Sequence, residues 1–185
     1  LGMSDTDVEV RDHMASRLAG VKARGEDGQL VDFDLAPPSK PEVYGMGHAL
    51  YSTPADYMKF LRMFLNRGAL DGNRILSEQS VGKMLENHMG PLTFEKMVTV
   101  ARPVIAFDPF AGTTKTYSFG FLRNEEDIPG MRRAGSQSWA GVLNSHYWFD
   151  PTSDLAGVIM TQSYPFVEPR WMKTYEAFER AAYAN

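Results

Sequence analysis

Apolar residues recur at helical spacing in the segment 52–68, which gives the clearest helix pattern in the chain. Thr53 is a suitable N-cap for this helix, and Pro54 suits its first helical position. Gly68 is a natural C-terminal stop. The spacing predicts one apolar face, made of Tyr57, Phe60, Leu61, Phe64 and Leu65.

Two further helices follow from the same spacing. One begins after Ser77 and ends near Asn87, with a buried stripe of Val81, Met84 and Leu85. The other covers 169–184, and its apolar face consists of Trp171, Met172, Tyr175, Phe178 and Ala182. We expect this last helix to bury that face against a sheet.

Elsewhere the pattern changes to the alternation that is typical of strands. Near the N-terminus it predicts a hairpin, with strands over 17–23 and 29–33 and a turn at 25–28. Three later strands are predicted over 116–122, 141–149 and 155–162. Strands that are grouped in sequence and followed by a helix favour an α+β fold, with an antiparallel sheet flanked by helices.

Composition limits the class of protein. The chain has 185 residues, of which 43% are hydrophobic, a globular balance that suits one domain. Its formal charge is −4, with no basic run, so we expect no nucleic-acid partner. No apolar stretch approaches the roughly 20 residues that span a membrane.

Metal and thiol chemistry find no support in the sequence. The chain has no cysteine, which excludes disulfides, thiolate metal sites and a cysteine nucleophile. Its four histidines are not at the spacing of a zinc site. We therefore expect no metal and no cofactor.

Several motifs, in order along the chain, resemble one family. The most distinctive segment is 135–151, GSQSWAGVLNSHYWFDP, which continues into a strand that ends in MTQ at 160–162. Residues 1–6 read LGMSDT, and residues 51–57 read YSTPADY. Together they resemble the serine β-lactamase and penicillin-binding-protein-like family, in its esterase branch. The resemblance implies a β-lactamase/transpeptidase-like fold.

The family resemblance also implies a site and a chemistry. Acyl transfer in this family passes through an acyl-serine, and a triplet on an edge strand precedes a backbone oxyanion donor. Trp139, Ala140 and Gly141 occupy the triplet position, so they are the expected substrate contacts. Val142 would supply the oxyanion N–H. Because Trp139 stands where relatives carry a polar or charged residue, an ester or neutral substrate is expected over a β-lactam carboxylate.

The catalytic serine, lysine and tyrosine of the family precede the LGMSDT turn, with which this chain starts. We therefore expect 1–185 to be the C-terminal part of a single β-lactamase-like domain, either a fragment or a processed chain. An expression product with trimmed ends would begin in the same way. The matches to S-x-x-K at 80–83 and to Y-x-N at 183–185 are interpreted as chance. The H-x-G match at 88–90 is interpreted as a helix terminus.

Other polar residues have structural interpretations. Ser136 and Ser138 are expected to bond local backbone as turn hydroxyls, since they do not fit G-x-S-x-G. His146 faces either the site or solvent. Asp5 and Asp7 are interpreted as a solvated face and not as an acid pair.

Two hypotheses for the function remain open. In the first, the whole protein is a serine hydrolase that acts on a small-molecule ester or amide, and the upstream half of the same protein, or a self-copy, covers the exposed sheet edge. In the second, the chain belongs to an inactive binding or structural module. The sequence does not determine the compartment.

Overall fold

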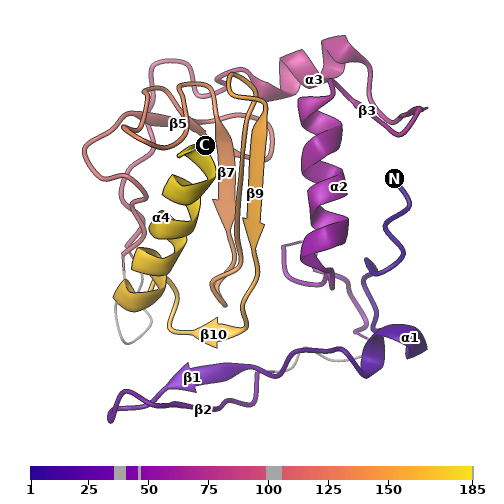
Figure 1. Cartoon of the computed structure of the whole chain (residues 1–185), viewed down its shortest axis with the longest axis vertical. Helices are drawn as coiled ribbons and strands as arrows, with labels where there is room; N and C mark the ends of the chain where they lie inside the picture. Colours follow the sequence, from indigo (N-terminus) through magenta and orange to yellow (C-terminus); the bar gives the residue numbers. More distant parts are fainter. Residues whose placement is uncertain (36–40, 46, 99–105, 185) are drawn as a thin grey trace.

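A five-stranded antiparallel sheet forms the centre of the molecule, with the strand order β5-β6-β7-β8-β9 (Figure 1). The computed structural model describes residues 1–35, 41–45, 47–98 and 106–184. The strands are β5 (Lys115–Tyr117), β6 (Leu122–Asn124), β7 (Gln137–Ala140), β8 (His146–Asp150) and β9 (Leu155–Ile159). Each strand pairs with the next along the chain, so the predicted α+β class with an antiparallel sheet is confirmed.

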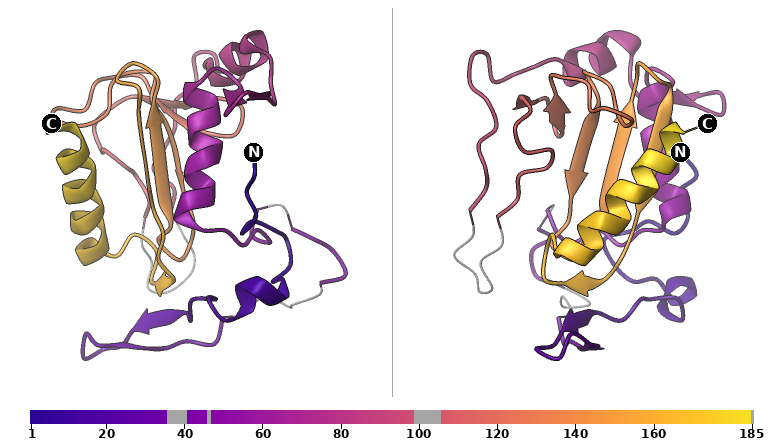
Figure 2. Two further views of the ribbon diagram at one scale, coloured as in Figure 1. Left: turned by 45° about the vertical axis from the view of Figure 1, so that its right-hand side comes forward. Right: turned by 60° about the vertical axis from the view of Figure 1, so that its left-hand side comes forward.

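Two helices, α2 (Pro54–Leu65) and α4 (Pro169–Tyr183), cover opposite faces of this sheet (Figures 1 and 2). Alternate side chains of a strand point to opposite faces, and β8 supplies both layers. The Phe149 ring packs 5.4 Å from Phe64 of α2. Its neighbour Trp148 packs 5.9 Å from Tyr175 of α4. The sheet is therefore buried on both sides of β8.

The ends of α2 follow the sequence signals. The Thr53 hydroxyl oxygen accepts the Asp56 N–H at 3.3 Å, and Pro54 is the first helical residue. Gly68 follows the helix with a φ of 93°. A Cβ on Gly68 would lie 2.2 Å from the Leu76 carbonyl oxygen, so only glycine fits this turn. The predicted helix is confirmed, although it ends three residues before Gly68.

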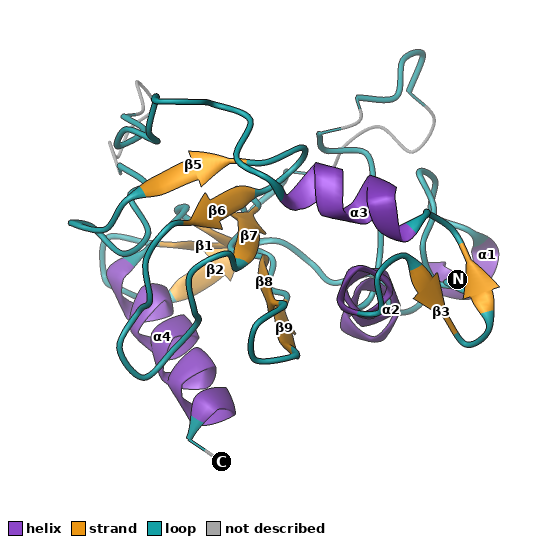
Figure 3. Ribbon diagram, turned by 90° about the horizontal axis from the view of Figure 1, so that it is seen from above, coloured by secondary structure: helices purple, strands orange, loops and turns teal. Residues whose placement is uncertain are grey.

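The segment after α2 forms a short hairpin and a second helix. Its elements are β3 (Ala69–Leu70), β4 (Asn73–Arg74) and α3 (Glu78–Leu85), which lies at the C-terminal end of α2 (Figure 3). Ser77 caps α3, because its Oγ accepts the Ser80 N–H at 3.0 Å. At the other end His88 Nε2 bonds the Lys83 carbonyl at 2.6 Å, as expected for a helix terminus.

The N-terminal hairpin is present but shorter than predicted. The short helix α1 (Asp12–Ala15) precedes β1 (Lys22–Arg24) and β2 (Leu30–Asp32), and β10 (Ser163–Tyr164) joins β1 in parallel. The Gly28 N–H donates to the Gly25 carbonyl at 3.0 Å and closes the predicted turn. The first strand begins at Lys22 and not at residue 17.

All three strands predicted after residue 115 were too long, and the one predicted over 155–162 ends at Ile159. The segment 116–122 turns between β5 and β6, where the Ser118 N–H donates to the Phe121 carbonyl at 3.0 Å. Gly120 has a φ of 96°, a left-handed conformation that interrupts the strand. Residues 141–145 form the turn between β7 and β8 instead of the start of a strand. Alternating side chains alone cannot distinguish one long strand from a tight hairpin.

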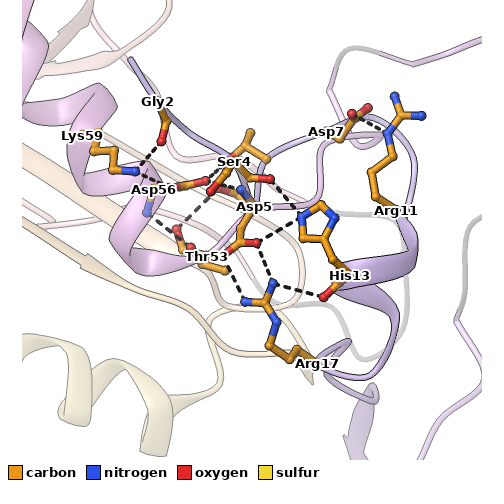
Figure 4. Close-up of polar contacts among 12 residues, drawn as sticks. Gly2, Ser4, Asp5, Asp7, Arg11, His13, Arg17, Thr53, Asp56 and Lys59 are labelled. Carbon is orange, nitrogen blue, oxygen red and sulfur yellow. Dashed lines mark hydrogen bonds and ion pairs between the residues drawn. The ribbon is translucent and has the colours of Figure 1, made fainter.

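A buried carboxylate fastens the N-terminal segment to α2 (Figure 4). Asp56 Oδ2 accepts the Asp5 N–H at 2.7 Å and the Thr6 hydroxyl at 3.1 Å, and Oδ1 pairs with Lys59 at 2.8 Å. Burial raises the pKa of Asp56, but these donors outweigh it and hold the pKa below its ordinary value.

Asp5 and Asp7 form ion pairs, so their interpretation as a merely solvated face needs correction (Figure 4). The Arg17 guanidinium bonds both oxygens of Asp5, at 3.0 and 2.5 Å. Arg11 bonds Asp7 at 2.7 Å. Because hydrogen bonds from these arginines favour the charged form, the pKa of each carboxyl lies below its ordinary value.

Candidate functional site

The hairpin between β7 and β8 carries the residues of the predicted triplet. Trp139 and Ala140 are the last residues of β7, and Gly141 opens the turn that follows. The Gly141 N–H donates to the Ser145 carbonyl at 2.8 Å, and this bond closes the hairpin. The expected position on an edge strand is wrong, because β7 is the middle strand of the five-stranded sheet and pairs with both β6 and β8. The triplet lies instead at the end of this strand, where backbone groups leave the ladder.

Val142 lies in this turn, and the residue is 58% exposed. Within the described parts of the chain, the Val142 N–H donates to no backbone or side-chain acceptor. Gly141 is also exposed, so nothing in the described residues covers this stretch of backbone. The geometry leaves a backbone donor at the surface, next to the triplet.

Gly141 is not required by the packing of this chain. A Cβ at this position would come no closer than 3.8 Å to the Ser145 carbonyl oxygen, an ordinary contact. Gly141 also does not have the left-handed conformation that favours glycine. The absence of a side chain here leaves the backbone open to close approach by another molecule.

Trp139 is half-buried and joins three other aromatic rings. Its ring centroid lies 5.7 Å from Tyr117 and 6.1 Å from Phe107. Phe94 lies 5.8 Å from Tyr117 and completes the group. These four residues, here called the aromatic wall, run from the triplet across β5. Burial raises the pKa of the Tyr117 hydroxyl. The wall presents an apolar surface beside the exposed backbone of the turn.

The charge of Lys115, a cation beside this wall, is paired. Lys115 Nζ lies 5.9 Å from the centre of the Phe94 ring, and the side chain is only 3% exposed. Its ammonium pairs with Asp108 at 3.1 Å and donates to the carbonyls of Phe110 at 3.2 Å and Thr113 at 2.9 Å. Since an ammonium has three N–H donors, all of the donors of Lys115 are in use.

The text match to S-x-x-K does not form a catalytic pair. The Ser80 and Ser77 hydroxyl oxygens lie 2.8 Å apart at the N-terminus of α3. Lys83 pairs instead with Glu86 at 3.0 Å. Serine and lysine of this match have separate local partners, in agreement with the interpretation as chance.

The match to Y-x-N also has a local role. The Tyr183 hydroxyl donates to Asp150 Oδ2 at 3.0 Å, and burial raises the pKa of Tyr183. Asn185, the third residue of the match, lies outside the described residues. Tyr183 therefore attaches α4 to the end of β8.

His146 faces neither the candidate site nor solvent. It is 3% exposed and points toward α4, where its ring lies 4.7 Å from that of Tyr175. Burial, helped by the charge of Arg132, lowers the pKa of His146 to about 4. The sequence left both of the other orientations open, because the register of β8 was unknown.

Ser136 lies in the interior, where its hydroxyl donates to Asn124 Oδ1 at 3.4 Å. The prediction of a bond to local backbone is therefore wrong for Ser136. Ser138 is buried as well. Ser138 is a residue of β7, which begins at Gln137, and Ser136 directly precedes this strand.

Within the described ranges, no three His, Asp or Glu side chains lie close enough together to hold a metal ion. None of the helices in the same ranges has the length and apolarity needed to cross a membrane.

Sequence reasoning missed Asn144 and three rings of the aromatic wall. Asn144 is 1% exposed, in the turn that holds Val142. Asparagine is favoured where a turn needs a residue in the left-handed backbone conformation. The asparagine in this turn was therefore the one sequence signal that could have identified the position. Phe94, Phe107 and Tyr117 gave no signal, because tertiary contacts alone bring them to Trp139.

Comparison with known proteins gives the family. The family model described as Beta-lactamase matches residues 1–182. A monacolin J acid methylbutanoyltransferase from Aspergillus terreus is 28% identical and matches 100% of this chain and 46% of its own length. A lovastatin esterase from Penicillium rubens is 30% identical over 60% of this chain and 28% of its own length.

Solved structures show the same fold. Simvastatin synthase from Aspergillus terreus, in a mutant form, superimposes with a TM-score of 0.79 at 23% identity. The match covers 99% of this chain and 46% of that one. The chain thus spans less than half the length of these relatives, and over nearly all of its residues it belongs to the Beta-lactamase family.

Proposed function

We propose that this chain is the C-terminal part of a single β-lactamase-like domain, in a serine hydrolase or acyltransferase that acts through a covalent acyl-enzyme. Family membership and the names of the relatives support acyl transfer as the chemistry. In this proposal the serine, lysine and tyrosine of the family lie in the upstream half of the protein. This chain contributes one wall of the active site.

The observation that carries the proposal is the exposed Val142 N–H beside Gly141. In the acylation step the upstream serine oxygen bonds to the carbonyl carbon, and the serine proton passes to the lysine–tyrosine pair. The carbonyl oxygen becomes negative and is stabilised by the Val142 N–H. The alcohol then leaves with that proton, and water or a second alcohol later takes the acyl group from the serine.

The aromatic wall supports a neutral substrate. Trp139 and its neighbours offer apolar contact area beside the reacting carbonyl, while Ala140 and Gly141 allow the substrate to lie along the strand end. Lys115 has no donor left for a substrate carboxylate. An ester with a bulky apolar group fits this surface better than an anion does.

The open edge of the sheet at β9 supports the proposal that another segment pairs with it. In the described residues β9 pairs with β8 alone, and its sequence, LAGVI, has no charged residue. Natural edge strands are commonly protected by charges or by a covering segment. We propose that the upstream half of the protein pairs with this edge; pairing with a self-copy is the other possibility.

Labelling with a fluorophosphonate tests the proposal. A polypeptide that includes the upstream half is expected to form an adduct on an upstream serine and to hydrolyse a p-nitrophenyl ester. This chain alone should do neither. Hydrolysis by this chain alone would show that the nucleophile lies within it, and the absence of an adduct on the longer polypeptide would favour an inactive binding module.

A matched pair of variants tests the oxyanion donor in the longer polypeptide. Val142→Pro removes the N–H, while Val142→Ala keeps it and shortens an exposed side chain. We expect Val142→Pro to lower kcat roughly 100- to 1,000-fold, the usual cost of losing one oxyanion donor. Val142→Ala should retain activity close to the parent. Equal activity of the two variants would remove Val142 from the mechanism.

A further inference from the structure

Asn144 occupies an unusual position in the turn that carries Val142. Its φ is 61°, in the left-handed region, and the residue is 1% exposed. Asparagine tolerates this conformation better than most residues. Burial of a polar side chain at the tip of a hairpin needs hydrogen-bond partners, and the structure provides them.

All three polar groups of the Asn144 side chain are satisfied. Nδ2 donates to the carbonyls of Ser163 at 2.8 Å and Pro165 at 2.9 Å. Oδ1 accepts the Val167 N–H at 2.7 Å. Only an amide offers two donors and an acceptor in this arrangement, since a carboxylate would face the two carbonyl oxygens without a proton.

Neighbouring residues add bonds between the turn and the same segment. The Leu143 carbonyl accepts the Ser163 N–H at 3.1 Å and the Thr161 hydroxyl at 2.8 Å. The Ser145 hydroxyl donates to the Thr161 carbonyl at 3.1 Å. The turn is thus fixed to 161–167 on the C-terminal side of Val142, and none of these bonds uses the Val142 N–H.

The backbone of Asn144 sets the direction of that N–H. The Gly141 carbonyl and the Val142 N–H belong to one peptide unit, in which they point in opposite directions. The Asn144 N–H donates to this Gly141 carbonyl at 2.9 Å. Holding the oxygen on the inner side of the turn therefore directs the Val142 hydrogen outward.

We infer that Asn144 is a positioning residue for the oxyanion donor: it holds the Gly141–Val142 peptide so that the N–H is pre-aimed at the reacting carbonyl oxygen. This inference rests on the proposed function. Preorganised donors stabilise the negative oxygen of the transition state more than they stabilise the neutral substrate. Loss of Asn144 should therefore affect kcat and leave KM nearly unchanged.

The main test is Asn144→Gly in the polypeptide that includes the upstream half. Glycine accepts the positive φ, so the variant removes the side-chain bonds with little backbone strain. Asp154→Gly is the matched control, because Asp154 also has a positive φ, of 51°, in the turn at the opposite end of β8. Thr161→Val is a second variant. It removes the hydroxyl that bonds the Leu143 carbonyl and so loosens the same turn without changing residue 144.

We expect Asn144→Gly to lower kcat for ester hydrolysis about tenfold, with KM within twofold of the parent. A boronic acid that mimics the tetrahedral intermediate should bind about tenfold more weakly. Thr161→Val should show a smaller change of the same kind, and Asp154→Gly neither change. A purely structural role would instead lower the stability of Asn144→Gly while its folded fraction kept the parent kcat and boronate affinity.

The outcomes separate the two proposals. If the parent forms an acyl-enzyme and both turn variants keep its kcat and boronate affinity, the role of Asn144 is refuted and the proposed function stands. If the parent forms no acyl-enzyme, the proposed function fails and this inference fails with it.

Discussion

Two glycines of the sheet show how differently the same residue is used. A Cβ at Gly157 would lie 2.1 Å from the Trp148 ring, which crosses β9 at that point. At Gly141 the nearest atom would be 3.8 Å away. Gly157 is therefore required by the packing of this chain, whereas Gly141 is free of any such requirement.

Alanine substitutions test this contrast. Gly157→Ala forces the buried Trp148 ring to move, and overpacking of this kind costs about 1–3 kcal/mol. Gly141→Ala should leave the free energy of unfolding within about 0.5 kcal/mol. Urea denaturation of both variants measures the difference. Equal stabilities would contradict the packing argument.

His146 makes stability depend on pH. Its pKa is about 4 in the folded chain, and an unfolded histidine titrates near 6.5. Between these values the unfolded state binds more protons, so stability is complete above about pH 6.5 and decreases as the pH falls toward 4. The expected loss at pH 5 is about 2 kcal/mol.

His146→Phe provides the comparison, because phenylalanine suits the aromatic surroundings of Tyr175 and cannot take up a proton. Between pH 7 and pH 5, the free energy of unfolding should decrease less in this variant than in the parent. The same decrease in both proteins would assign the pH dependence to other groups.

Among the elements, α4 depends on one buried ion pair. The guanidinium of Arg132, in the segment before β7, bonds both carboxylate oxygens of Glu179 at 2.7 and 2.6 Å and the Tyr175 hydroxyl at 2.6 Å. Arg132 and Glu179 are at most 1% exposed. The pair therefore fixes the rotation of α4 over the sheet.

Removal of one partner leaves the other charge buried without compensation. Glu179→Gln is expected to cost about 3–5 kcal/mol, while Glu176→Gln on the exposed side of α4 should have little effect. Thermal and urea unfolding of the two variants measure these losses of stability. Near-equal stabilities would show that a neutral amide satisfies Arg132 as well as the carboxylate does.

The whole molecule has an apolar groove of about 470 Å³ between α2, α3 and the turn that joins β5 to β6. Its lining includes Leu1, Tyr57, Phe60, Leu76, Phe119 and Tyr147. Phe119 is 54% exposed there. Under the proposed function, the upstream half of the domain covers this groove.

This arrangement predicts complementation between two separate polypeptides. The chain alone should bind a hydrophobic dye, and addition of the upstream half should displace the dye and restore ester hydrolysis. Phe119→Ser should weaken dye binding and complementation, whereas Val43→Ser, at an exposed site that does not line the groove, should change neither. Sedimentation equilibrium distinguishes this pairing from a self-copy, and unchanged dye binding on mixing would contradict it.

Elements with local causes could be predicted from the amino-acid order alone. The caps at Thr53 and Ser77, the stop at Gly68 and the apolar spacing of α2 act within a few residues, so α2 and α3 were predictable, whereas the four-residue helix α1 was not predicted. The ordered motifs were enough to give the family. Strand limits were less certain, because the alternation over 116–122 fits either one strand or a hairpin.

Arrangements that depend on distant contacts became visible only in the folded chain. Folding brings Phe94 and Phe107 to Trp139, turns His146 toward α4, and bonds Asn144 to a segment about 20 residues away. Each of these arrangements depends on strand register and on distant side-chain partners. The residues adjacent in sequence determine neither of them. The orientation of the Val142 amide belongs to this second group, since hydrogen bonds across the turn fix it.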